Sequence, residues 1–123
     1  MISRMRFASI TVTDIDEAKD FYVNKLGFRV LVEMPLPGEN QFVMVAPAGG
    51  GSSLVFSMPM PGQEHTAVSG IAFETDDVRL TYDELIAKGV SFPKPPADTA
   101  WGGVEAVFAD PFGNTFMLQQ GGI

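Results

Sequence analysis

Few side chains of this chain can take part in acid–base, nucleophilic or metal chemistry. Its 123 residues include one histidine, His65, and no cysteine. The absence of cysteine excludes disulfides, thiolate catalysis and iron–sulfur clusters. A single histidine also excludes any site that needs two imidazole groups from one chain. His65 follows Gln63 and Glu64 in a polar segment, which is typical of an exposed linker histidine without a role. Contact with a ligand is the alternative.

One carboxylate is a candidate general base. Alternation along a predicted strand places Glu74 on the inner face of a sheet, where burial would raise its pKa. A carboxyl group tuned in this way can exchange protons with a substrate. Alternatively, Glu74 forms a salt bridge with an arginine such as Arg6 or Arg29, or it is simply exposed at the rim of the sheet. Glu105 also lies in a strand-like segment, but the sequence leaves its face open.

Composition and charge restrict the function classes further. Hydrophobic residues make up 46% of the chain and charged residues 19%, as in a folded globular domain. Eight Lys and Arg against fifteen Asp and Glu give a net charge of −7, which argues against binding to nucleic acid. No apolar stretch approaches the roughly 20 residues that span a bilayer, and no apolar signal segment opens the chain. We therefore expect a cytoplasmic protein without membrane contact.

The elements that position these residues form a repeat. Asp14 recurs 63 residues later as Asp77, and Gly27 recurs after 62 residues as Gly89. Aspartate accepts hydrogen bonds at the start of a helix, and glycine favours the left-handed turn at its end. This spacing predicts helices near residues 15–25 and 78–88, each followed by three strands.

Strand-like runs complete both halves of the repeat. In the first half they are Arg6–Thr13, Phe28–Glu33, Gln41–Ala46 and Ser53–Ser57. In the second half they are Gly70–Thr75, Val90–Phe92, Val104–Ala109 and Thr115–Gln119. The segment Asp110–Asn114 (Asp-Pro-Phe-Gly-Asn) predicts a tight turn. We predict one domain over 1–123, with a first module at about 4–58, a linker at about 59–68 and a second module at about 69–121.

Two of these motifs resemble a known family. The pattern Asp14…Phe21-Tyr22…Leu26-Gly27-Phe28, followed by Asp110-Pro111-Phe112-Gly113-Asn114, is similar to that of the vicinal oxygen chelate superfamily. This group includes glyoxalase I, bleomycin-resistance proteins and extradiol dioxygenases. The resemblance covers essentially the whole chain. It implies an α+β fold in which two βαβββ modules form an open, cup-shaped β-sheet with helices outside. It also implies a homodimer with a small-molecule ligand in the cup.

The same resemblance implies where metal-using members hold their ion. Those positions lie on the first and last strands of each module and carry His, Gln or Glu. In this chain they are occupied by Phe7, Val55, Gly70 and Met117. None of these side chains offers an oxygen or imidazole ligand, and moving from Val55 to Phe56 does not supply one. We therefore expect no metal and no cofactor. The space left by Gly70 beside the Phe7 ring suits a flat apolar ligand better than an ion.

Strand alternation predicts the residues that line the cup. The set combines apolar and polar side chains, as small-molecule pockets usually do. The predicted ligand-binding residues are Phe7, Ser9, Thr11, Gly70, Ala72, Glu74, Trp101, Met117 and Gln119, and Thr115 shares their face. Alternatively, the two halves simply fill their own interior. Trp101 lies in a loop, and it either covers the cup or packs on the body of the protein or a dimer interface.

Together these features favour a small-molecule-binding protein of the glyoxalase/bleomycin-resistance type. We expect it to work without metal and to confer resistance by sequestering a partly aromatic molecule, and not to be an enzyme. The alternative is a glyoxalase-type lyase, isomerase or dioxygenase, which would need unexpected metal ligands or acid–base chemistry through Glu74. A third possibility is a subunit whose main role is association.

Overall fold

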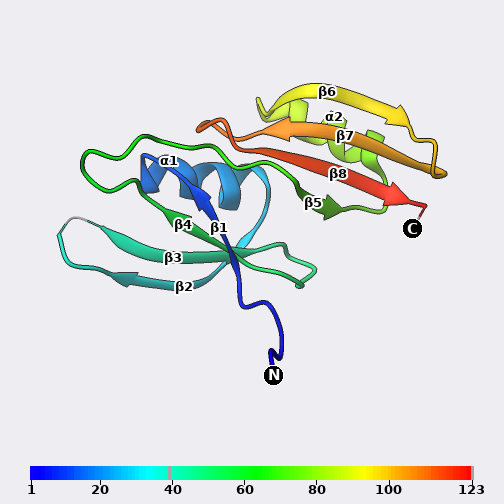
Figure 1. Ribbon diagram of the computed structural model, residues 1–123. Coiled ribbons are helices and arrows are strands. Elements are labelled where there is room, and N and C mark those ends of the chain that lie inside the picture. Colours follow the sequence, from blue (N-terminus) through cyan, green and yellow to red (C-terminus); the bar gives the residue numbers. More distant parts are fainter. Residues whose placement is uncertain (39, 123) are drawn as a thin grey trace. The chain divides into compact units, whose positions relative to one another are not determined.

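The computed structural model describes residues 1–38 and 40–122 (Figure 1). The chain divides into two compact units, Met1–Thr66 and Ala67–Ile123. The boundary falls within the segment predicted as a linker. Each unit contains one strand, one helical segment and three further strands, in that order. Among the described residues, no helix is long and apolar enough to cross a membrane.

The first unit is a four-stranded mixed sheet with one helical segment. The sheet has the order β1-β4-β3-β2, in which β1 and β4 are parallel and the other neighbours are antiparallel. A short α-helix continues directly into a π-helical turn, η1. The elements are β1 (Ala8–Thr11), α1 (Ile15–Lys19), η1 (Asp20–Lys25), β2 (Arg29–Pro35), β3 (Gln41–Ala46) and β4 (Leu54–Ser57).

The second unit repeats this plan. Its sheet has the order β5-β8-β7-β6, and the first and last strands, β5 and β8, are again parallel. The elements are β5 (Ile71–Glu74), α2 (Val78–Ala87), β6 (Ser91–Asp98), β7 (Gly103–Ala109) and β8 (Thr115–Gly121). The predicted βαβββ repeat is therefore confirmed.

Both helices begin and end as the repeat predicts. Asp14 accepts a hydrogen bond from the Glu17 N–H, and Asp77 accepts one from the Leu80 N–H, each at 3.0 Å. These bonds satisfy amides that a helix cannot pair internally. The chain then leaves each helix through a glycine with positive φ, 76° at Gly27 and 86° at Gly89. The two aspartates thus occupy equivalent positions.

Each helix covers one face of its own sheet. In the first unit the Tyr22 ring lies 5.4 Å from the Phe56 ring, so η1 contacts β4. The fully buried side chains here include Ile10, Val12, Tyr22, Val43 and Val45. In the second unit the core is aromatic, with ring contacts among Phe73, Phe92, Phe108 and Phe116, and Tyr82 of α2 lies 4.7 Å from Phe92. Because successive side chains of a strand point to opposite faces, the other face of each sheet is not covered by its helix, and we call it the open face.

Three strands, β1, β5 and β6, have clearly different bounds from those predicted. β6 continues to Asp98 through three prolines, although only Val90–Phe92 was predicted as strand. It can do so because it is an edge strand whose pairing with β7 shifts register twice, and prolines are tolerated at edges and bulges. β1 and β5 are shorter than predicted, so Phe7 and Gly70 lie just before these strands and not within them.

A buried polar turn joins β7 to β8. Asp110 accepts hydrogen bonds from the Phe112 and Asn114 N–H groups, both at 2.9 Å, and from the Asn114 side-chain amide at 2.7 Å. The Asn114 side-chain oxygen in turn accepts the Val68 N–H at 2.7 Å. Asn114 is fully buried. Its side chain therefore fixes the chain entering β5 to the turn before β8.

Replacing Asn114 with alanine tests this anchor. The change removes the acceptor of the half-buried Val68 N–H and the side-chain amide that bonds Asp110, and we expect the free energy of unfolding to fall by about 1–3 kcal/mol. Urea denaturation measures the loss. Asn24→Ala is the matched control, because exposed Asn24 bonds only Asp20 across a helical turn. Equal losses in the two variants would contradict the assigned role of Asn114.

Candidate functional site

In the second unit, the open face of the sheet carries two parallel rows of side chains. Register places Ala72, Met117 and Val107 side by side on β5, β8 and β7. The adjacent row consists of Glu74, Gln119 and Glu105. Ala72 and Glu74 are exposed, and the other four are half-buried. The structure thus brings four predicted ligand-binding residues together as an apolar row beside a polar row.

The polar row has a defined internal contact. The side-chain amide of Gln119 donates a 2.6 Å hydrogen bond to Glu105 and lies 3.8 Å from the Met117 sulfur. Glu105 was not among the predicted site residues. The alternation of buried Ala106 and Phe108 with half-buried Glu105 and Val107 places it on the open face. In the sequence this signal is weak, because both faces of β7 are mostly apolar.

Glu74 is exposed. The predicted general-base role depended on burial of this side chain. The exposure matches the alternative of a carboxylate at the rim. A catalytic role for Glu74 stays a prediction that this environment does not support.

The first unit presents its own set of predicted residues. Ser9 pairs with Val55, and Val55 pairs with Met44, so these three share the open face. The Phe7 ring contacts the Phe42 ring edge-on, with centroids 6.3 Å apart. Thr11 pairs with Ser57 at the end of β1. That this set and the set of the second unit line one cup stays a prediction.

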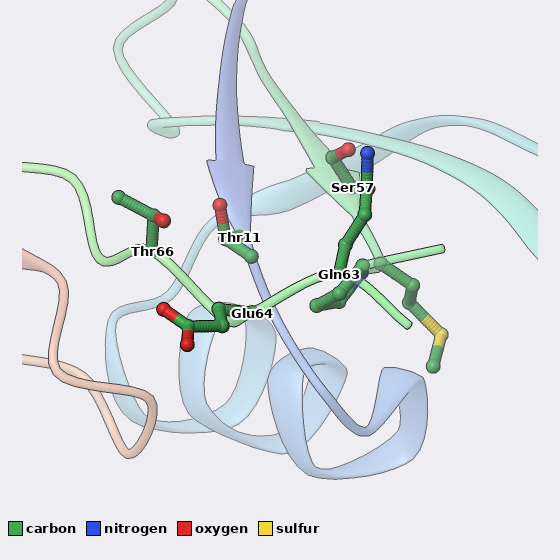
Figure 2. A pocket seen from close by; sticks show the side chains of 7 residues that line it. Thr11, Ser57, Gln63, Glu64 and Thr66 are labelled. Atoms are coloured by element: carbon green, nitrogen blue, oxygen red, sulfur yellow. The ribbon is translucent and has the colours of Figure 1, made fainter. Parts of the chain in front are cut away.

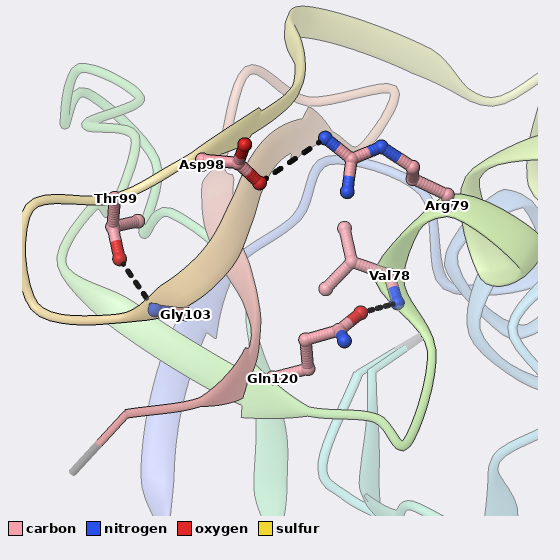
Figure 3. A network of polar contacts seen from close by, with 6 residues as sticks. All are labelled: Val78, Arg79, Asp98, Thr99, Gly103 and Gln120. Carbon is pink, nitrogen blue, oxygen red and sulfur yellow. Dashed lines mark hydrogen bonds and ion pairs between the residues drawn. The ribbon is translucent and has the colours of Figure 1, made fainter.

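Trp101 packs on glycine backbone in the second unit. A Cβ atom at Gly103 would lie 2.2 Å from its ring, and one at Gly122 would lie 2.0 Å from it. The side chain is 37% exposed. The loop that carries it is held by the Thr99 hydroxyl, which accepts the Gly103 N–H at 2.9 Å (Figure 3). This packing fits the alternative in which Trp101 rests on the body of the protein, and its contact with a ligand stays a prediction.

The same end of the second unit is tied to the start of α2. Gln120 accepts the Val78 N–H through its side-chain oxygen, and Arg79 pairs with Asp98 at 3.4 Å (Figure 3). Gln120 follows Gln119 on β8 and points to the helix side. The two consecutive glutamines therefore lie on opposite faces of the sheet. Gln120 bonds the first residue of α2, and Gln119 bonds Glu105 on the open face.

None of the four positions implied for metal carries an oxygen or imidazole ligand. Val55 is buried and Met117 is half-buried, whereas Phe7 and Gly70 are exposed. Across residues 1–38 and 40–122, no three His, Cys, Asp or Glu side chains gather in a group suited to a metal. Donor chemistry at these positions therefore does not fit a divalent ion.

A hollow of about 440 Å³ lies in the first unit (Figure 2). It opens where the parallel strands β1 and β4 end. Its lining consists of Thr11, Ser57, Met58, Pro59, Gln63, Glu64 and Thr66. Of these residues only Thr11 was predicted to bind ligand, because the others lie in or beside the linker, whose path the sequence does not determine.

The fold and these faces define a two-module βαβββ protein with open sheet faces. The chain matches the model of the Glyoxalase/Bleomycin resistance protein/Dioxygenase superfamily over residues 4–118 and belongs to that superfamily. The resemblance seen in the sequence is thereby confirmed, and the chain is a protein of the glyoxalase/bleomycin-resistance type.

Several relatives cover nearly the whole chain. A solved superfamily member from Sphaerobacter thermophilus is 35% identical, with a TM-score of 0.88 over 98% of both chains. TnmS3, described as an antibiotic binding protein from Streptomyces sp. CB03234, is 36% identical, with a TM-score of 0.84 over 97% of this chain and 96% of that one. The uncharacterized protein YetH of Bacillus subtilis (strain 168) is 33% identical over 98% of this chain and 100% of its own length.

The contact of Trp101 with glycine can be tested by Gly103→Ala. The new methyl group meets the indole ring and the Gln120 carbonyl, so the ring must leave its place and the fold loses about 1–3 kcal/mol. Trp101 is the only tryptophan, so we expect its fluorescence emission to move to longer wavelength as the ring enters water. Gly49→Ala is the control, because nothing lies within 4 Å of a Cβ there. Unchanged emission in Gly103→Ala would contradict the packing.

Proposed function

We propose that the protein binds a small, partly aromatic molecule in the cytoplasm and sequesters it without metal and without turnover. The observation that carries this proposal is the pair of rows on the open face of the second unit. The apolar row of Ala72, Met117 and Val107 can contact a flat ring, and the neighbouring Glu74 and Gln119 can bond its polar substituents. Small-molecule sites combine an apolar surface with a few polar groups in this way.

The comparisons supply independent support. TnmS3, to which the chain is 36% identical, is described as an antibiotic binding protein. Sequestration requires only complementary contacts, whereas glyoxalase-type lyase, isomerase or dioxygenase chemistry requires a Lewis acid or a tuned base. The residues at the four implied metal positions supply no oxygen or imidazole ligand, and Glu74 is exposed. Both facts favour binding over catalysis.

Native mass spectrometry tests binding and turnover together. We expect the purified protein to retain a ligand or to bind members of a panel of aromatic antibiotics, each released with unchanged mass, and a chelator to leave the affinity unaltered. Met117→Lys places a charge in the apolar row and should weaken binding at least tenfold, about 1.4 kcal/mol. Ile86→Lys, on the helix and 44% exposed, is the control. A product of altered mass would instead establish an enzyme, and binding lost with the chelator would refute binding without metal.

We also infer that the protein forms a homodimer. The edge strand β2 is exposed along its whole length, and Val30, Leu31, Val32 and Met34 are between 36% and 49% exposed. An edge strand carries unpaired backbone groups, and contiguous exposed apolar side chains mark interaction surfaces. A second copy covering this strand would remove both from water.

Sedimentation tests the dimer and this surface. We expect a species of twice the 13.3 kDa chain mass at micromolar concentration, and Leu31→Lys should raise the dimer dissociation constant at least tenfold because it buries a charge. Leu80→Lys changes an exposed leucine of α2 in the same way and serves as the control. A wild-type monomer would refute the dimer, and equal behaviour of the two variants would refute the role of β2.

A further inference from the structure

The hollow in the first unit differs in chemistry from the open face of the second. Its volume of about 440 Å³ lies within the range of small-ligand sites. Five of its seven lining side chains can form hydrogen bonds, and the remaining two, Met58 and Pro59, are apolar. A flat hydrocarbon would meet mostly polar side chains here. The hollow therefore suits a ligand group rich in hydrogen-bonding atoms.

The frame of the hollow is fixed by hydrogen bonds within the first unit. Thr11 and Ser57 are register partners at the ends of β1 and β4. A turn of the linker completes the lining and is closed by two local bonds: the Gln63 N–H donates to the Met60 carbonyl at 2.9 Å, and the Met60 N–H donates to the Gln63 side-chain oxygen at 3.1 Å. The second bond orients the Gln63 carboxamide, whose nitrogen supplies donors.

The polar side chains that line the hollow comprise one carboxylate, one carboxamide and three hydroxyls. In the view of Figure 2, Glu64 and Thr66 lie on one side, Ser57 and Gln63 on the other, and Thr11 between them. Glu64 is the one charged side chain of the lining, and the chain as a whole carries −7. An ionised carboxylate accepts hydrogen bonds only, and it binds an ammonium group more strongly than a neutral donor.

We propose that this hollow binds a protonated amine carried on a hydroxylated ring, such as an amino sugar. Glu64 pairs with the ammonium group, the hydroxyls of Thr11, Ser57 and Thr66 bond the ring hydroxyls, and Met58 and Pro59 contact its C–H face. The inference rests on the proposed function in one respect: Thr11 is shared with the predicted ligand-binding residues, so the amine-bearing ring would be one part of the sequestered molecule.

Amide chemical shifts measured by NMR test the inference with three probes. Glucosamine carries both charge and hydroxyls, glucose carries hydroxyls alone, and butylammonium carries charge alone. The probes are compared at about pH 6, where both amines are protonated. We expect glucosamine to shift the amides of residues 57–66 and Thr11 and to bind several-fold tighter than either other probe.

Variants then separate the two kinds of contact. Glu64→Gln should weaken glucosamine about threefold to tenfold, to the level of glucose. Ser57→Ala should weaken glucosamine and glucose but not butylammonium. Glu84→Gln, an exposed carboxylate on α2 of the second unit, should change nothing, and the spectra themselves show that each variant is folded.

Three outcomes would overturn the inference: shifts confined to other residues, equal affinities for glucosamine and glucose, or an unaltered affinity in Glu64→Gln. These outcomes leave the proposed function standing when the aromatic panel still binds in native mass spectrometry. Conversely, glucosamine binding at this hollow, with no aromatic ligand bound anywhere, would overturn the proposed function alone.

Discussion

The parallel pairing of the first and last strands in each unit is the constraint on which the structure depends. Parallel strands cannot be joined by a tight turn, so the helix and two further strands must lie between them in the chain. This pairing also sets which side chains are neighbours. The register of β5 and β8 brings Ala72 beside Met117 and Glu74 beside Gln119, although each pair is distant in sequence. The composition of the open face follows directly from that register.

The register of the second unit is held by a buried polar turn as well as by strand pairing. Asn114 bonds both Asp110 and the Val68 N–H, and the Thr115 N–H bonds the Val68 carbonyl. These contacts join the entry of β5 to the start of β8 before the parallel ladder begins. A polar network with every group paired favours one register over its alternatives, since a slip would leave buried groups unsatisfied. The same residues that signal the turn in the sequence thus also align the face that carries the candidate site.

The sequence predicts those features that local chemistry decides. Asp14, Asp77 and the glycines that end each helix mark the elements because capping and positive φ depend on residues close in the chain. Alternation likewise predicts the open faces. The extent of β6 and the place of Glu105 escape prediction for a shared reason: each depends on a partner strand, which the neighbouring residues do not encode. For Trp101 the sequence left two alternatives open, because its packing depends in part on Gly122, which is distant in the chain.

Charge limits what the site can accept. The open face of the second unit presents Glu74 and Glu105 with a glutamine between them, and the hollow of the first unit presents Glu64. The chain carries a net charge of −7, so an anionic ligand approaches against the field of the whole protein. A carboxylate or phosphate on the ligand would also face carboxylates at close range. For the proposed ligand we therefore expect a neutral or cationic molecule, because carboxylates on both surfaces disfavour an anion.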